Sequence, residues 1–255
     1  MRKFFYPKSI AVAGLSSNPA KVANTILANL KEMEYPGKIF AIGKNRGEIF
    51  GIPIHTSLEE IKEKIDLLVL MVPAETVPDM LTAAGRAGID RVVIHSAGFN
   101  ELGGEGSRLA RKIKQIADTY GIRFIGPNCQ GIICPESKTC LPFGFLNRDQ
   151  VRKGGVAIVA QSGSVAWLGT SQLSYESVGV SKVISIGNKL NVDELALLEY
   201  LLEDPETSII VLYLESFTDG RKLCEMARTS RKPIIVFKSN TSGKPSALAM
   251  SHTAA

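Results

Sequence analysis

Short apolar runs alternate along the chain with longer segments in which apolar residues recur every three or four positions. Runs bounded by glycine and proline are typical of strands buried on both faces of a parallel sheet, and the three-to-four spacing predicts amphipathic helices between them. The pattern therefore predicts an α/β protein. In the first half of the chain, strands are expected at residues 10–13, 38–42, 66–72, 91–95 and 123–125.

Helices are expected between these strands. Pro19 fits the first turn of one helix, whose buried face would carry four apolar residues at helical spacing, Val22, Ile26, Leu27 and Leu30. Two further helices are expected at residues 76–87 and 105–120.

The second half of the chain continues the pattern, with strands expected at residues 156–160, 182–186, 208–214 and 233–237. Helices are expected from about residue 165 and over residues 194–203. Between the halves, residues 132–148 contain Pro135 and Pro142, and we expect a linker with a short hairpin there. We place the domain boundary near Asn147, which divides the chain into residues 1–147 and 148–255.

Composition and charge narrow the function classes. The chain has 255 residues, of which 45% are hydrophobic and 22% charged, as in ordinary globular proteins. It has no apolar run of about 18 residues, so we expect no membrane span. Four cysteines without CxxC pairing favour reduced thiols in a cytoplasmic protein. The net charge of +5 suits a polyanionic small ligand, and the lack of a basic block with interleaved aromatics argues against nucleic acid.

The loop after the first strand begins at Gly14 and resembles a dinucleotide-binding turn without its three glycines, since Ser16, Ser17 and Asn18 stand in their place. After the second strand, Lys44 and Arg46 stand where NAD enzymes usually carry an acidic residue. A basic residue there favours a phosphorylated ribose or another phosphate-rich ligand, and the alternative is a solvated basic turn.

Two later loops follow predicted strands, at the sheet edge where α/β proteins bind ligands. The first is glycine-rich and includes Ser96, Ala97 and Gly98; the second, residues 126–131, carries Asn128 and Cys129. Cys129 has no partner histidine nearby in sequence, so lining a pocket is favoured over acting as a nucleophile. His95, at a strand end, is interpreted as a core histidine in preference to a catalytic one.

The stretch from residue 154 to 169 predicts a buried strand, a turn at Ser162, Gly163 and Ser164, and a helix N-terminus. Such a turn presents backbone N–H groups to an anion, usually a phosphate; the alternative is an ordinary strand-to-helix loop. Glu215 directly follows another predicted strand, where an acid is often functional, although helix capping would also explain an acid there. Composition alone leaves His252 as a solvated histidine near the end of the chain.

Seven of these segments occur in one order that resembles the α-subunit portion of NDP-forming acyl-CoA synthetases, the acetate–CoA ligases (ADP-forming). The chain is similar, more distantly, to the α subunit of succinyl-CoA synthetase. The segments are residues 13–19, 96–99, 126–131, 161–164, 185–189, 213–215 and 251–253. The resemblance implies a Rossmann-like CoA-binding domain followed by a flavodoxin-like, doubly wound domain.

The resemblance also implies site residues. Coenzyme A would contact the first loop, the basic residue after the second strand and the two later loops: Gly14, Ser16, Ser17, Asn18, Pro19, Lys44, Ser96, Ala97, Gly98, Asn128 and Cys129. His252 would be the phosphorylated histidine, Glu215 would hold its ring, and Ser162, Gly163 and Ser164 would bind its phosphate. The resemblance implies no metal ligand in this chain.

The implied reaction is acyl-CoA + Pi + ADP ⇌ carboxylate + CoA + ATP, through an acyl phosphate and a phosphohistidine. The implied partner is an ATP-grasp subunit or domain that holds Mg-ATP or Mg-ADP, and an oligomer is expected. Two departures are Ala254, where the family usually has glycine, and a chain end three residues after His252. We therefore expect this chain alone to bind CoA without turnover.

The sequence leaves two alternative functions. The first is a CoA-binding regulatory or recruiting module without turnover. The second is an NAD(P)-dependent oxidoreductase, which the missing glycines and the missing acidic residue disfavour.

Overall fold

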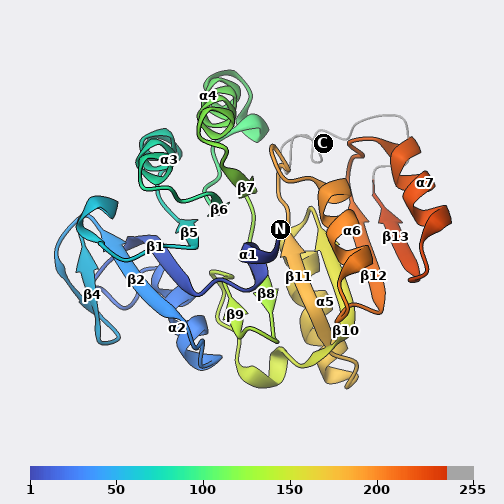
Figure 1. Cartoon of the computed structure of the whole chain (residues 1–255). Helices are drawn as coiled ribbons and strands as arrows, with labels where there is room; N and C mark the ends of the chain where they lie inside the picture. The colour runs from blue at the N-terminus through green and yellow to red at the C-terminus, as the bar shows by residue number, and fades with distance from the viewer. Residues whose placement is uncertain (240–255) are drawn as a thin grey trace.

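The computed structural model of the protein describes residues 1–239, which form two sheets with helices packed against them (Figure 1). The first sheet has the strand order β3-β4-β2-β1-β5-β6-β7 and the second has the order β13-β12-β10-β11-β8-β9. His252 lies outside the described residues. The α/β fold class is confirmed.

The first sheet is parallel except for its edge hairpin β3–β4. Its strands are β1 Ser9–Leu15, β2 Lys38–Gly43, β3 Gly47–Ile49, β4 Ile52–His55, β5 Leu67–Leu70, β6 Arg91–Ile94 and β7 Arg123–Ile125. The helices of this half are α1 Arg2–Phe5, α2 Asn24–Glu32, α3 Val77–Arg86 and α4 Gly104–Tyr120, with 3₁₀ turns at Leu58–Glu60, Ala74–Thr76 and Asn100–Leu102.

The second sheet combines parallel strands with an antiparallel hairpin, β8–β9, at one edge. Its strands are β8 Gly131–Cys134, β9 Thr139–Cys140, β10 Lys153–Ala160, β11 Val180–Ser185, β12 Ile209–Leu214 and β13 Ile234–Lys238. The helices are α5 Gly163–Tyr175, α6 Glu194–Glu203 and α7 Gly220–Thr229, and a 3₁₀ turn spans Arg148–Gln150.

The expected hairpin after residue 131 is present as β8–β9. It does not lie in a linker, because both strands belong to the second sheet. The chain leaves the first sheet after β7 and enters the second at β8, earlier than Asn147. The boundary at residue 147 stays a prediction, because sheet membership alone does not define a domain.

The helix after the first loop begins later than expected. It starts at Asn24, and Val22 is 54% exposed, so placing Val22 on the buried face was wrong. The cause is the buried Asn24 side chain, whose amide nitrogen donates to the carbonyl oxygens of Ser16 at 2.8 Å and Asn18 at 2.7 Å. These bonds hold the preceding residues in a loop.

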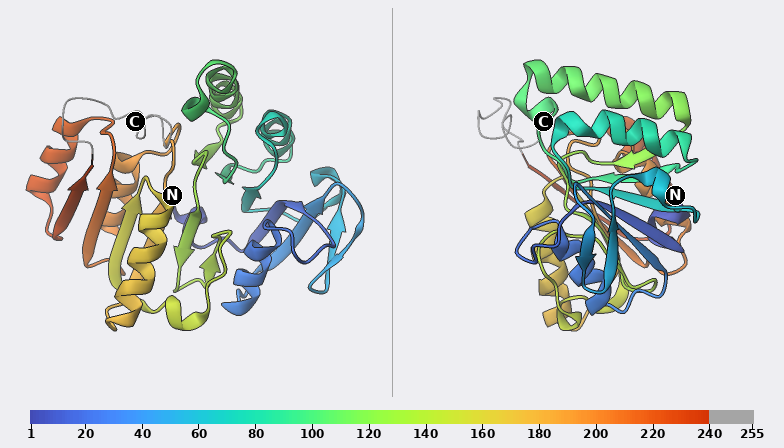
Figure 2. Two further views of the ribbon diagram at one scale, coloured as in Figure 1. Left: turned by 180° about the vertical axis from the view of Figure 1, so that it is seen from behind. Right: turned by 90° about the vertical axis from the view of Figure 1, so that its left-hand side faces the viewer.

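The two faces of the first sheet bury alternate side chains, as the pleat requires. Ile10 and Val12 of β1 pack with the core on the α2 side, whereas Ala11 and Ala13 pack with the core under α3 and α4. Figure 2 shows α3 and α4 on one side of this sheet and α2 on the other. The parallel strands are therefore buried on both faces.

The core on the α2 side continues into the second sheet. Phe4 and Phe5 of α1 are fully buried in it, together with Val159 of β10 and Leu212 of β12. The short N-terminal helix thus contributes two large side chains to a core shared by both sheets.

A hydrogen-bonded contact between residues 124–128 and residues 187–192, which we call the seam, joins the two halves. The backbone N–H groups of Asn188 and Leu190 donate to the carbonyls of Pro127 and Gly126, at 3.0 and 3.2 Å. Gly187 is required there because it has a φ of +52° and a Cβ at this position would lie 2.3 Å from the Pro127 carbonyl oxygen.

Lys182 of β11 is a fully buried lysine whose ammonium group contacts two carboxylates. Its Nζ lies 2.6 Å from Asp204 Oδ2 and 3.3 Å from Glu206 Oε2. The Tyr6 hydroxyl donates to the same Glu206 oxygen at 2.6 Å. The cluster ties the N-terminal segment to the second sheet.

We expect Lys182→Ala to lower the free energy of unfolding by about 3–5 kcal/mol, because Asp204 stays buried without its counter-charge. Urea denaturation measures this. The control is Lys114→Ala, since Lys114 and Asp118 form an exposed pair at 3.5 Å on α4, and losing such a pair costs less than about 0.5 kcal/mol. Equal losses in the two variants would contradict the assignment of Lys182 as the buried anchor.

Candidate functional site

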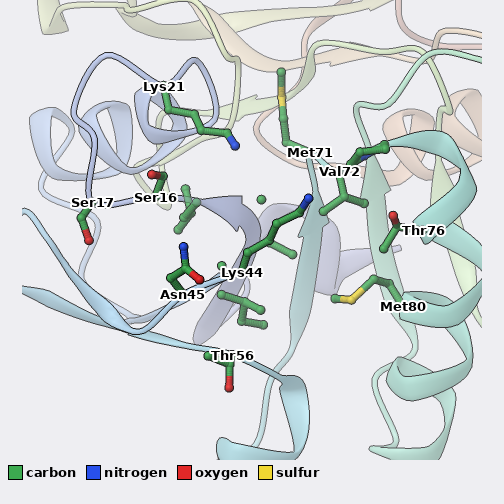
Figure 3. A pocket seen from close by; sticks show the side chains of 16 residues that line it. Ser16, Ser17, Lys21, Lys44, Asn45, Thr56, Met71, Val72, Thr76 and Met80 are labelled. Atoms are coloured by element: carbon green, nitrogen blue, oxygen red, sulfur yellow. The ribbon is translucent and has the colours of Figure 1, made fainter.

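A cavity of about 400 Å³, the first pocket, opens at the carboxyl ends of β1, β2 and β5 (Figure 3). The residues that line it belong mainly to the loops that follow these strands. They are Ala13, Gly14, Leu15, Ser16, Ser17, Lys21, Ile42, Gly43, Lys44, Asn45, Thr56, Met71, Val72, Pro73, Thr76 and Met80.

Gly14 lets the loop after β1 approach β5 closely. Its φ is +102°, and a Cβ there would lie 2.0 Å from the carbonyl oxygen of Met71. A side chain would therefore force the two strand ends apart. With the Asn24 side chain holding the next turn, the loop has one defined path along the pocket.

The first pocket is basic on one side and mostly apolar on the other. Figure 3 shows Lys21 and Lys44 extending toward the same space from two loops, while Val72, Thr76 and Met80 line the side that follows β5. Two ammonium groups beside an apolar wall suit a ligand that joins phosphate groups to an apolar ring.

Four residues predicted for the phosphate-rich ligand line the first pocket: Gly14, Ser16, Ser17 and Lys44. Asn18 and Pro19 belong to the same loop but do not line it. The sequence reasoning missed Lys21, because that residue was assigned to a helix; a lysine three residues after the serine-rich turn could have suggested it.

A second pocket of about 450 Å³ lies between the two sheets. The first sheet contributes the loop after β6 and the second contributes the turn from β10 into α5. The lining residues are His95, Ala97, Gly98, Glu101, Leu102, Asn128, Cys129, Gln130, Phe143, Gln161, Gly163 and Ser164. Six of these were predicted site residues: Ala97, Gly98, Asn128, Cys129, Gly163 and Ser164.

Ser96, a predicted site residue, lines neither pocket. Its hydroxyl donates to the carbonyl oxygen of Val72 at 2.5 Å. Val72 lines the first pocket, and Ala97 lines the second. Ser96 thus ties the loop after β6 to the segment after β5, between the linings of the two pockets.

The N-terminus of α5 faces the second pocket through Gly163 and Ser164. Ser162 is the N-cap residue and makes no side-chain cap bond, so the first N–H groups of the helix are not capped by it. Such groups carry partial positive charge and suit an anion. Ser162 itself is 8% exposed and does not line the pocket.

Gln161 connects this turn to Glu215. Its Oε1 accepts the backbone N–H groups of Glu215 and Ser216, at 2.7 and 2.9 Å. Lys238 Nζ donates to the Glu215 carbonyl oxygen at 2.7 Å. The backbone of Glu215 is thus fixed beside the start of α5, although Glu215 is 9% exposed and does not line the second pocket.

Burial sets the protonation of two residues in the second pocket. It raises the pKa of the Cys129 thiol to about 12, so a nucleophilic thiolate is disfavoured at neutral pH. It lowers the pKa of His95 to about 4, so the imidazole is neutral. Both residues are uncharged parts of the lining of the second pocket.

The part of the chain that the structure describes has neither a cluster of metal ligands nor a membrane-spanning helix. Among residues 1–239 no three or more His, Cys, Asp or Glu side chains gather where they could hold a metal ion. No helix in this range has the length and apolar character needed to cross a membrane.

Comparison with known proteins gives the family. Residues 8–135, half of the chain, match the model of the CoA binding domain. The chain belongs to the CoA-binding domain family. Residues 153–255 match the succinyl-CoA ligase like flavodoxin domain, which confirms the expected order of a CoA-binding domain and a flavodoxin-like domain.

The relatives that the chain matches are longer than the chain itself. It is 38% identical to acetate–CoA ligase [ADP-forming] I of Archaeoglobus fulgidus over 99% of its own length and 36% of the relative. It is 37% identical to the α subunit of acetate–CoA ligase [ADP-forming] I of Pyrococcus furiosus, covering 99% and 55%. The resemblance to ADP-forming acyl-CoA synthetases is confirmed.

A solved structure supports the same relationship. Dinucleotide-forming acetyl-coenzyme A synthetase 1 of Candidatus Korarchaeum cryptofilum, in complex with phosphate and ADP, superposes with a TM-score of 0.91 at 31% identity. The comparison covers all of this chain and 55% of the other. The chain thus spans about one third to one half of the relatives it matches.

The low pKa of His95 makes stability depend on pH. Unfolded His95 binds a proton below its ordinary pKa of about 6.5, whereas the folded protein resists protonation down to about pH 4. The free energy of unfolding should therefore fall by about 3 kcal/mol as the pH drops from 6.5 to 4. Urea denaturation of wild type and His95→Leu at several pH values measures this free energy. If it changes with pH in the same way in both proteins, the fall does not come from His95.

Proposed function

We propose that this chain is the CoA-binding and His-phosphorylated part of an NDP-forming acyl-CoA synthetase. The complete reaction would be acyl-CoA + Pi + ADP ⇌ carboxylate + CoA + ATP. The observation that supports it most is the pair of pockets, one with two lysines and one at a helix N-terminus, at the carboxyl ends of parallel strands.

In this proposal the phosphorylated nucleotide end of CoA occupies the first pocket. Lys21 and Lys44 neutralise its phosphates, and the polar side chains Ser16 and Ser17 donate hydrogen bonds. The arm of CoA follows the wall at Ser96 and brings the thiol to the second pocket, beside Asn128 and Cys129. Asn18 and Pro19 act by shaping the loop.

The second pocket is proposed as the place where phosphoryl transfer begins. Phosphate attacks the acyl-CoA carbonyl, giving an acyl phosphate and free CoA. A ring nitrogen of His252 then takes the phosphoryl group and releases the carboxylate. The α5 N-terminus at Ser162, Gly163 and Ser164 would bind the phosphate of phosphohistidine, and the Glu215 carboxylate would hold the other ring nitrogen.

The nucleotide step needs a partner. We propose that an ATP-grasp subunit or domain holds Mg-ADP and accepts the phosphoryl group from His252, which yields ATP and restores the histidine. The P. furiosus relative is named as an α subunit, and the K. cryptofilum structure is a complex with phosphate and ADP. The carboxylate would be a small acid. A larger, oligomeric enzyme is part of the proposal.

The CoA part is tested by calorimetry. We expect Lys44→Glu to weaken CoA binding by about 1–3 kcal/mol, because a charge-assisted contact is replaced by repulsion. The control is Lys112→Glu, which makes the same charge change on exposed α4, outside both pockets. If both variants bind CoA as wild type does, Lys44 does not contact the ligand.

The phosphoryl part is tested with the chain, an ATP-grasp partner, Mg²⁺ and ATP labelled at the γ-phosphate. We expect an acid-labile label on wild type and on His55→Ala, and none on His252→Ala. Label that persists in His252→Ala would remove the phosphohistidine from the proposal. CoA binding without any label would instead favour a recruiting module.

A further inference from the structure

The second pocket holds a polar group with no role in the proposed reaction, the imidazole of His95. It is 5% exposed, and its Nδ1 lies 2.9 Å from the carbonyl oxygen of Cys129. A carbonyl oxygen only accepts hydrogen bonds, so Nδ1 carries the proton and Nε2 keeps a lone pair. Within residues 1–239 no group hydrogen-bonds to this buried Nε2.

Gly131 and Phe143 border the imidazole of His95. Gly131 makes room for the ring, since a Cβ there would lie 2.8 Å from His95 Cε1. Phe143 meets the ring edge-on, with centroids 5.6 Å apart, and is only half-buried. His95 and Phe143 both line the second pocket, so the imidazole borders its space.

A second acceptor borders the same pocket. The Glu101 carboxylate receives the Gly98 N–H at 2.6 Å and the Asn188 side-chain amide at 2.5 Å. Each carboxylate oxygen has a further lone pair, so Glu101 can accept another bond. The Gln130 amide also lines the pocket, but it can present either its oxygen or its nitrogen and does not discriminate.

The two walls of the second pocket therefore favour different ligand groups. The N-terminus of α5 favours an anion, whereas His95 Nε2 and Glu101 can only accept hydrogen bonds. A ligand that satisfies both has a carboxylate or phosphoryl group together with a hydrogen-bond donor.

We infer that the acid used at this site is a short-chain carboxylic acid that bears a hydroxyl group, which donates to His95 Nε2. This rests on the proposed function, because it takes the second pocket as the acyl site. An unsubstituted acid of the same length leaves the His95 lone pair unpaired, and His95 is thus a specificity residue.

The direct test is ¹⁵N NMR of the full chain labelled at histidine, of which there are three in the sequence. Comparison with His95→Leu assigns the signals. We expect the Nε2 signal of His95 to move upfield when 3- or 4-hydroxybutanoate is added and to stay in place with butanoate. No shift, or the same shift with all three acids, would overturn the inference.

A titration with CoA alone is a further test, because the pantetheine arm of CoA carries amide and hydroxyl donors. A shift of His95 Nε2 with CoA alone, unchanged by any acid, would show that the arm is the donor and would also overturn the inference.

Kinetics with the ATP-grasp partner give an independent readout. We expect wild type to prefer a hydroxybutanoate over butanoate by at least about tenfold in kcat/KM. The preference should vanish in His95→Leu, return in part in His95→Gln, which keeps an acceptor, and persist in His55→Leu. A wild-type ratio of one would overturn the inference. A protein inactive with every acid would refute the proposed function, and the NMR titration would still decide the specificity.

Discussion

The hydrogen bonds along the seam are the constraint on which the arrangement of the site depends. The Pro127 and Gly126 carbonyls accept N–H groups from residues 188 and 190, and Gly187 alone permits that approach. The same loop continues into Asn128 and Cys129 in the second pocket. Because the seam fixes this loop against the second sheet, the strand ends of β6 and the start of α5 face one space. Loss of the seam would leave the loop at Asn128 and Cys129 without these backbone bonds to the second sheet.

The two pockets present positive charge to a ligand through different groups. The first presents lysine side chains beside an apolar wall, and the second presents the N–H groups at the start of α5. Lysine charges suit a ligand that binds and leaves, since they remain hydrated on exposed loops. Backbone groups are fixed before the ligand arrives, so they suit a phosphate held in one geometry. Buried Cys129 and His95 stay neutral and add no charge to the second pocket, where Glu101 supplies a carboxylate.

Sequence periodicity located the central strands well because they are buried on both faces and read as uninterrupted apolar runs. It missed the β3–β4 hairpin, whose residues are partly exposed and give no clear alternation. It also placed Pro19 and Val22 in a helix, since nothing local reveals that the Asn24 side chain would bond back to Ser16. Lys44 followed from its place after a strand, whereas Lys21 entered the first pocket through that unpredicted loop. The contact between Gln161 and Glu215 joins residues far apart in sequence, which local patterns do not report.

The most direct test of the account is a crystal structure of the chain with CoA. The account predicts that the nucleotide phosphates lie in the first pocket beside Ser16 and Lys44 and that the thiol end reaches the second pocket past Ser96. CoA bound elsewhere, or a thiol end that points away from the α5 N-terminus, would contradict it.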